Sequence, residues 1–190
     1  MPAKKSKDEQ TNLKNQILAL VKEVPGNMGV YIRHIERGDE ISIEADKVFP
    51  LGTVFQIAVM VEVFRQFEKG ALSLDDKIEL ADNHKAVGPG ILQYMSPGLN
   101  LSVKDLLVLM MTISDNTATD LLWKKIGVQS VNMVLRDFGF TRTNIYITNR
   151  EYQLMSLLLG KEFEDLTMSE LVQSWKNRSQ IDKTRTMASI

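Results

Sequence analysis

The side chains best suited to take part in a reaction stand at the start of a long apolar segment. Pro50 and Gly52 interrupt the chain, and apolar residues then dominate until Gly70. This pattern predicts a buried helix with a turn before it and a glycine cap after it. Thr53 stands at the expected N-cap, where the positive end of the helix dipole and its free amides could hold an oxyanion. One interpretation of Thr53 is therefore a hydroxyl placed where the helix end can stabilise an oxyanion.

The same junction also has a purely structural interpretation. Thr53 and Gln56 form the Thr-x-x-Gln pattern of a capping box, in which the hydroxyl and the glutamine side chain each satisfy a free backbone amide. This interpretation predicts only a well-capped core helix. Gln56 is in addition a neutral amide, which cannot accept a proton as a basic side chain can.

A second polar group follows the most apolar stretch of the sequence. Residues 106–113 read Leu-Leu-Val-Leu-Met-Met-Thr-Ile, which predicts a helix that is surrounded by protein on every side. Ser114, Asp115 and Asn116 then form a polar break. By itself such a tripeptide is a common turn sequence, so its meaning depends on the segments that accompany it.

Together, these segments resemble the serine beta-lactamase and penicillin-binding protein (transpeptidase-like) superfamily, and class A beta-lactamases in particular. The Phe-Pro-x-x-Thr-Val-Phe-Gln-Ile frame is similar to the nucleophile segment of that family, where a Ser-x-x-Lys opens the central helix. Thr53 stands in the place of the serine and Gln56 in the place of the lysine. The resemblance further implies that Ser114 relays a proton, that Asn116 holds the substrate amide and that Asp115 supports the turn.

Two weaker similarities concern single residues. Tyr94 resembles the aromatic residue that walls the substrate entrance in the family, although an aromatic that pins a loop to the core would look the same. Glu151 resembles the glutamate that activates the deacylating water in class A enzymes, with Met155 in place of the family's asparagine. Glu151 is explained equally well as the N3 partner of Thr148 in a capping box, and we favour the cap.

The last family signature, Lys-Thr-Gly or Lys-Ser-Gly on a strand, is missing. Lys183-Thr184-Arg185 comes nearest, but Arg185 replaces the glycine that lets the substrate approach. The resemblance covers residues 29–147, so we expect an α/β (α+β) fold of the beta-lactamase/transpeptidase type. In this fold a helix-rich domain lies against an antiparallel sheet, and its C-terminal strands are absent.

The remaining segments complete this outline. Residues 1–10 read as a disordered tail, and residues 11–190 as a single, incomplete domain. Apolar periodicity predicts an amphipathic helix at 11–24, and alternation around an Arg-Gly-Asp turn predicts a hairpin of 28–35 with 40–45. Further helices are expected at 117–126 and 128–138 and after the capping patterns that begin at Ser102, Thr148 and Thr167.

Composition limits the classes of function. The net charge is −1, which argues against nucleic acid as a main partner. There is no cysteine, and the two histidines lie in separate segments, so we expect neither a metal site nor another cofactor. No apolar run reaches the length of a membrane span. Residues 1–12 lack the apolar core of a signal peptide, which fits either a cytoplasmic protein or an exported one without its leader.

Three functions remain open at this point. By resemblance, the chain performs acyl transfer on a small-molecule beta-lactam or a peptidoglycan-type D-alanyl peptide, with turnover very weak or absent. Alternatively, it is a catalytically dead binding or scaffold module that keeps the cleft. A third possibility is a fragment that a missing half or a second copy completes, for instance by segment swapping.

Overall fold

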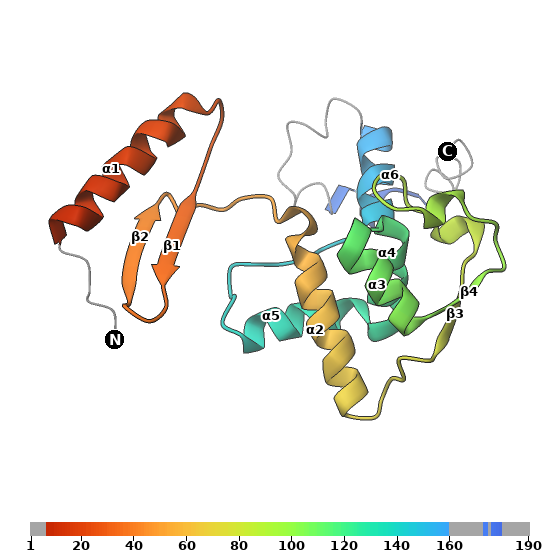
Figure 1. The fold of residues 1–190 in the computed structure, drawn as a ribbon. Coiled ribbons are helices and arrows are strands. Elements are labelled where there is room, and N and C mark those ends of the chain that lie inside the picture. The colour runs from red at the N-terminus through yellow and green to blue at the C-terminus, as the bar shows by residue number, and fades with distance from the viewer. Residues whose placement is uncertain (1–6, 160–172, 175, 180–190) are drawn as a thin grey trace. The chain divides into compact units, whose positions relative to one another are not determined.

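A computed structural model describes residues 7–159, 173–174 and 176–179 (Figure 1). The chain forms two compact units, Met1–Pro50 and Leu51–Ile190, which are described separately. Two sequence patterns, the Thr167 cap and Lys183-Thr184-Arg185, lie outside the described residues.

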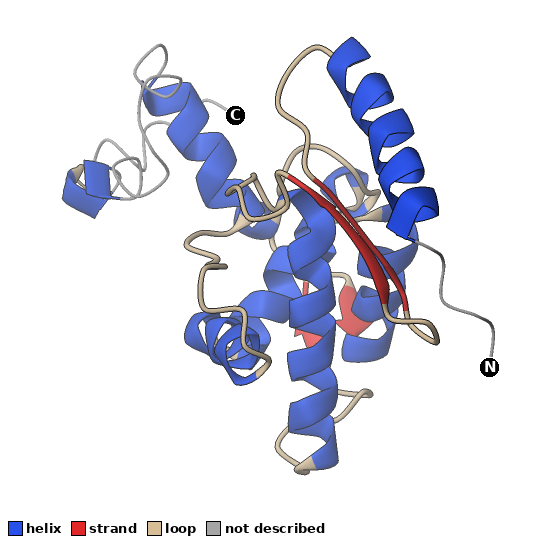
Figure 2. Ribbon diagram, turned by 90° about the vertical axis from the view of Figure 1, so that its left-hand side faces the viewer, coloured by secondary structure: helices blue, strands red, loops and turns tan. Residues whose placement is uncertain are grey.

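The first unit is a helix packed on a hairpin (Figures 1 and 2). It consists of α1 (Lys7–Glu23), β1 (Val30–His34) and β2 (Asp39–Ile43). The strands pair antiparallel, with Ile32 opposite Ile41, which confirms the predicted hairpin. In β2 the inward side chains Ile41 and Ile43 are buried, as alternation requires. The helix starts one turn earlier than the apolar pattern predicts, and acidic residues in its first turn favour that start.

The second unit is dominated by helices, as Figure 2 shows. Its strands β3 (Lys77–Glu79) and β4 (Asn100–Ser102) form only a short antiparallel ladder. This helix-rich α/β arrangement with small antiparallel sheets confirms the expected fold class. None of the described helices combines the length and hydropathy needed to cross a membrane. The helices are α2 (Phe55–Glu68), α3 (Val103–Ile113), α4 (Asn116–Ile126), α5 (Val128–Asp137) and α6 (Asn149–Leu159).

The central helix of this unit is α4. It packs against α2, α3, α5 and α6, and every residue from 116 to 123 is buried. The prediction that residues 106–113 are enclosed on every side is wrong, because Val108, Met111 and Ile113 of α3 are each more than 40% exposed. Hydropathy failed here because α4 carries polar side chains that are satisfied by hydrogen bonds, which allows them to be buried.

Candidate functional site

Thr53 does not cap the apolar helix. It lies exposed in a single turn of 3-10 helix, Gly52–Val54, and α2 follows with Val54 at its N-cap and without a side-chain capping bond. The predicted capping box of Thr53 with Gln56 is therefore wrong. The 3-10 turn carries the chain into the helix in helical geometry already, so no residue takes up the extended conformation of a capping residue.

The side chain of Gln56 points across to the turn between α3 and α4 instead. Its Nε2 donates to Oγ1 of Thr119 at 3.1 Å, and its Oε1 accepts from Oγ of Ser114 at 3.3 Å. Gln56 is only 4% exposed, so these bonds satisfy an amide that would otherwise be costly to bury. The structure thus brings two of the predicted site residues, Gln56 and Ser114, into direct contact.

Ser114 itself has an unusual backbone. It ends α3 in the left-handed backbone conformation, with φ 54° and ψ 38°. Residues other than glycine and asparagine rarely adopt this conformation. Its backbone N–H still bonds to the carbonyl of Leu109, which closes the helix. Such conformations persist where the surroundings enforce them, and they are frequent at functional sites. Here the conformation turns the chain so that Ser114 can reach Gln56.

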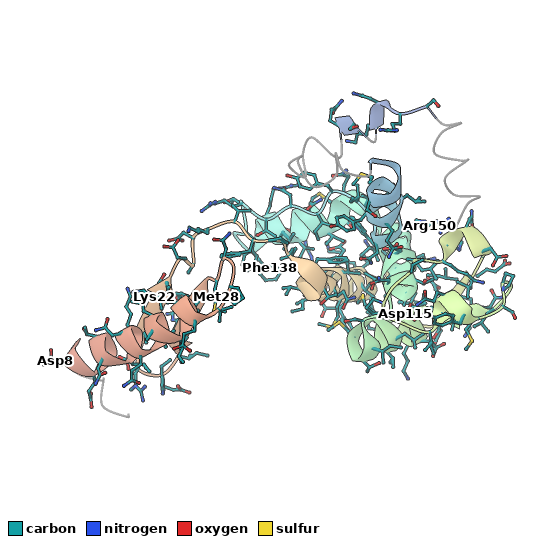
Figure 3. All side chains as sticks on the ribbon, turned by 90° about the horizontal axis from the view of Figure 1, so that it is seen from above. Asp8, Lys22, Met28, Asp115, Phe138 and Arg150 are labelled. Atoms are coloured by element: carbon teal, nitrogen blue, oxygen red, sulfur yellow. The ribbon has the colours of Figure 1, made fainter. Side chains whose placement is uncertain are left out.

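Asp115 supports the turn, as the resemblance implies. It lies at the junction of α3 and α4, where Figure 3 labels it, and its Oδ1 caps α4 by accepting from the amide of Ala118 at 2.9 Å. Its Oδ2 accepts from the amides of Ile91 and Leu92 at 2.7 and 3.0 Å. One carboxylate therefore fixes both the start of a helix and a loop that lies more than twenty residues away.

Asn116 holds the same loop a few residues earlier. Its Nδ2 donates to the carbonyl of Val87 at 2.9 Å, and its backbone amide donates to the carbonyl of Pro89 at 3.0 Å. The loop passes so close that a Cβ on Gly88 would lie 2.7 Å from Asn116 Nδ2. The side chain to which the resemblance assigns substrate binding thus donates from Nδ2 to the protein's own backbone.

Tyr94 lies at the end of a short 3-10 helix, Leu92–Tyr94, on this loop. Its side chain is 81% exposed, so it does not pin the loop to the core; the neighbouring Leu92, at 1% exposure, does so. The amide of Leu92 is bonded to Asp115, which ties the position of Tyr94 to the polar turn. The structural alternative for Tyr94 is therefore wrong, whereas its part in a substrate entrance stays a prediction.

Glu151 is engaged in a helix cap. Its Oε2 accepts from the amide and the hydroxyl of Thr148 at 2.9 and 3.0 Å, and its own amide donates back to Thr148 Oγ1 at 3.2 Å. The predicted capping box at the start of α6 is confirmed. The Glu151 carboxylate already accepts two hydrogen bonds from Thr148, which weakens the case for Glu151 as an activator of water.

Two residues of α4 belong to this region although the sequence patterns gave them no part. Thr119 contacts Gln56, as described above. Asp120 accepts from the amide and Nδ2 of Asn149 and from the amide of Arg150, at 2.9, 3.0 and 2.9 Å. Burial raises the pKa of Asp120 to about 6, although these hydrogen bonds oppose the shift. The available signal was spacing, because both residues lie one turn after Asp115 and Asn116 on the same helix.

Among the described residues, no three His, Asp or Glu side chains converge as they would to hold a metal ion. The chemistry that this arrangement offers is hydrogen bonding by neutral side chains. Ser114, Gln56 and Thr119 form one continuous hydrogen-bond network, and Thr53 lies exposed in the turn just before the helix that carries Gln56.

Comparisons with known proteins agree with this picture. A family model described as the beta-lactamase enzyme family matches residues 12–184. A curated beta-lactamase of Phocaeicola vulgatus is 28% identical over 115 residues, which are 59% of this chain and 36% of that protein. Beta-lactamase VEB-1 of Pseudomonas aeruginosa is 29% identical over 144 residues, which are 74% of this chain and 48% of that protein. The chain thus spans less than half the length of these two relatives.

The fold is also similar to those of solved beta-lactamases and of PBP-A. The beta-lactamase from Sphaerobacter thermophilus superposes with a TM-score of 0.67 at 25% identity, covering 85% of this chain and 66% of that one. PBP-A superposes with a TM-score of 0.70 at 25% identity, covering 91% and 69%. A PBP-A mutant is known as an acyl-enzyme complex with penicillin G; it superposes with a TM-score of 0.70 at 25% identity, covering 90% and 68%. Because the family model covers most of its sequence, the chain belongs to the beta-lactamase enzyme family.

Proposed function

We propose that this chain binds beta-lactams or D-alanyl peptides beside Thr53 and Ser114, and that it turns them over very weakly or not at all. The family and the fold support the ligand class, as does the penicillin G complex of the PBP-A mutant. In the family's scheme Thr53 is the nucleophile, Gln56 occupies the lysine position, and Ser114, Asn116 and Tyr94 line the cleft.

The observation that carries this proposal is that Gln56 is buried and hydrogen-bonded at the position of the family's lysine. Its amide is buried and hydrogen-bonded to Ser114 and Thr119, and it has no group that takes up a proton near neutral pH. General-base assistance contributes roughly 10²- to 10⁴-fold to a typical rate, and a glutamine cannot supply it. Glu151 offers no ready substitute, because its carboxylate caps α6. The methyl group of Thr53 adds steric crowding at the attacking oxygen.

The test combines covalent labelling with reversible binding. The unmodified chain is incubated with a fluorescent penicillin and separated on a denaturing gel, and penicillin G hydrolysis and reversible binding are followed separately. We expect measurable binding, with labelling and hydrolysis near background. Fast turnover by the unmodified chain contradicts the proposed inactivity. The absence of any binding contradicts the proposed ligand class.

Restoring the family residues tests the same idea in the other direction. The double change Thr53→Ser and Gln56→Lys supplies both a less hindered nucleophile and a proton acceptor. We expect it to raise penicillin labelling by roughly 10²-fold or more over either single change, because both groups act in one step. Labelling that is equal for the single and double variants would show that Gln56 does not limit the reaction.

A second candidate arises from the length of the chain. It covers only 36% and 48% of the two curated relatives, so a second polypeptide that supplies the remaining part of the domain could complete the site. The labelling assay separates this candidate from the first, because added partner chain should then restore labelling without any substitution.

A further inference from the structure

A short chain of hydrogen bonds inside the second unit connects α2 with the turn before α4. Gln56 on α2 is 4% exposed and Thr119 on α4 is fully buried, while Ser114 is half-buried. The amide of Gln56 lies between the two hydroxyls and contacts both of them. Each hydroxyl carries a single proton, so the directions of these bonds are coupled.

The hydroxyl of Thr119 sets the donor-to-acceptor direction of these hydrogen bonds. Its Oγ1 lies 2.8 Å from the carbonyl oxygen of Asp115, one turn earlier, and donates its proton there, as threonine often does in helices. Toward Gln56 the same oxygen can only accept. The NH₂ group of Gln56 therefore faces Thr119, at 3.1 Å, because the opposite orientation would place a carbonyl oxygen against a lone pair.

This orientation fixes what Ser114 can do. With its NH₂ group at Thr119, Gln56 presents Oε1 to Ser114 Oγ at 3.3 Å. A carbonyl oxygen only accepts, so the hydroxyl proton of Ser114 points to Gln56. The remaining lone pairs of Ser114 Oγ are then available to a ligand, but its proton is not.

We infer that Thr119, acting through the amide of Gln56, makes Ser114 a hydrogen-bond acceptor, so that the site prefers ligands that present an N–H group there. This inference rests on the proposed function and deepens it. The peptide bond of a D-alanyl-D-alanine ligand carries such an N–H, whereas the lactam nitrogen of a penicillin carries no hydrogen. Thr119 is a positioning residue, since it acts on the ligand only through Gln56 and Ser114.

A pair of ligands that differ at one position provides the test. Titration calorimetry compares an N-acyl-D-alanyl-D-alanine with its ester analogue, N-acyl-D-alanyl-D-lactate, in which oxygen replaces the N–H. We expect the unmodified chain to bind the peptide roughly tenfold more tightly, because the ester loses a hydrogen bond and sets two acceptors against each other. The ratio of the two affinities is the readout, since a general loss of stability weakens both ligands alike.

Matched variants connect that ratio to the network. Thr119→Val removes the hydroxyl at nearly constant shape. The side-chain amide of Gln56 can then flip, so the ratio of peptide affinity to ester affinity should fall toward one. Thr119→Ser keeps the hydroxyl and should keep the ratio. Thr117→Val is the control, because Thr117 is an equally buried threonine of α4 whose hydroxyl bonds to Ala86 and not to Gln56. Its ratio should stay that of the unmodified chain.

Each outcome decides between the two claims. Equal binding of peptide and ester by the unmodified chain overturns the inference and leaves the proposed function standing. An unchanged ratio in Thr119→Val also overturns it. If Thr119→Val does not fold, Ser114→Ala replaces it and must likewise abolish the preference. If neither ligand binds the unmodified chain, the inference fails, and the penicillin G binding assay decides separately whether the proposed function fails as well.

Discussion

Single side chains of the turn after α3 hold a loop that is remote in sequence. Asp115 binds the amides of Ile91 and Leu92, and it occupies the space that a side chain on Gly90 would need. Gly90 has a φ of +110°, and a Cβ placed there would clash with Oδ2 and the backbone Cα of Asp115. Glycine is required at this position for two separate reasons, backbone conformation and space.

Replacement of Gly90 by alanine should therefore be strongly destabilising. We expect Gly90→Ala to lower the free energy of unfolding by roughly 2–4 kcal/mol, because it combines a disfavoured φ with a contact that only movement of Asp115 relieves. Gly98→Ala is the control: Gly98 has a φ of +89° but no atom within 4 Å of its added Cβ, so it should cost about 1–2 kcal/mol. Equal losses in urea unfolding would show that space at Gly90 is irrelevant.

Among the helices, similar capping sequences have different outcomes. Ser102 caps α3: its Oγ accepts from the amide of Asp105 at 3.0 Å, and the amide of Ser102 donates to Asp105 Oδ2 at 3.0 Å. Thr148 and Glu151 do the same for α6. Thr53 does not cap α2, because the chain enters that helix through a 3-10 turn. The pattern alone cannot distinguish these cases, since the deciding variable is the backbone conformation before the helix.

Alanine substitutions measure this difference. Ser102→Ala should lower the free energy of unfolding by about 1 kcal/mol, the usual loss for a capping side chain. Thr53→Ala should change it by less than about 0.5 kcal/mol, as for an exposed residue outside any special feature. Chemical denaturation of both variants under one set of conditions provides the comparison. A loss at Thr53 as large as that at Ser102 would restore the cap interpretation.

One helix also caps another. Asp120 of α4 receives the first amides of α6, from Asn149 and Arg150, and Figure 3 labels Arg150 at that end. Burial nevertheless raises the pKa of Asp120 to about 6, against an ordinary 3.8. The folded state therefore binds this proton more tightly than the unfolded state. Lys124 on the same helix is the charged group that opposes the shift, whereas Arg150 contributes only its backbone amide.

The sign of the resulting pH dependence follows from linkage. The contribution of Asp120 to stability is complete below about pH 4 and is lost as the pH rises through about 6, by roughly 2–3 kcal/mol in total. Thermal unfolding between pH 4 and 7 measures it, and Asp120→Asn should flatten this part of the profile. Hydrogen bonds from the hydroxyl and amide of Ser102 lower the pKa of Asp105, whose contribution disappears only below about pH 4 and does not overlap. A steep profile that persists in Asp120→Asn would contradict the assignment.

For the molecule as a whole, the consequential feature of α2 is an apolar face that the described part of the chain leaves uncovered. One of its faces contributes the fully buried Val59 and Val63 to the core. Its other face carries Ile57, Phe64 and Phe67, which are 51, 43 and 44% exposed. Apolar side chains at such spacing form a stripe along the helix, and exposed stripes of this kind mark interaction surfaces.

We predict that this stripe causes the chain to associate, either with itself or with a polypeptide that completes the domain. Sedimentation velocity of the purified chain should show species larger than a monomer, and Ile57→Glu combined with Phe64→Glu should shift them toward the monomer. Met133→Glu is the control, because Met133 is 51% exposed on a different helix, α5. A compact monomer with a cooperative thermal transition would show that the stripe is covered within one chain.

Local sequence patterns were enough to predict the family, the hairpin, the positions of most helices and two of the capping boxes. These features depend on local patterns: alternation, helical periodicity, and the short spacing of capping residues. The sequence also linked the segment around Gln56 with the segment around Ser114. Both segments resemble the same family, although Thr53 and Gln56 differ from the family's serine and lysine. The contact between these two side chains agrees with that pairing.

The identity of the central helix and the role of each polar side chain depend instead on contacts between distant segments. Residues 106–113 are more apolar than α4, yet α4 is the buried element, since its Thr117, Thr119 and Asp120 find partners on other elements. A polar residue can be buried only if a partner is present, and the partners here lie 29 to 63 residues away. Local sequence carries no information at that distance. For the same reason it could not show that Gln56 turns away from Thr53 and toward Ser114 and Thr119.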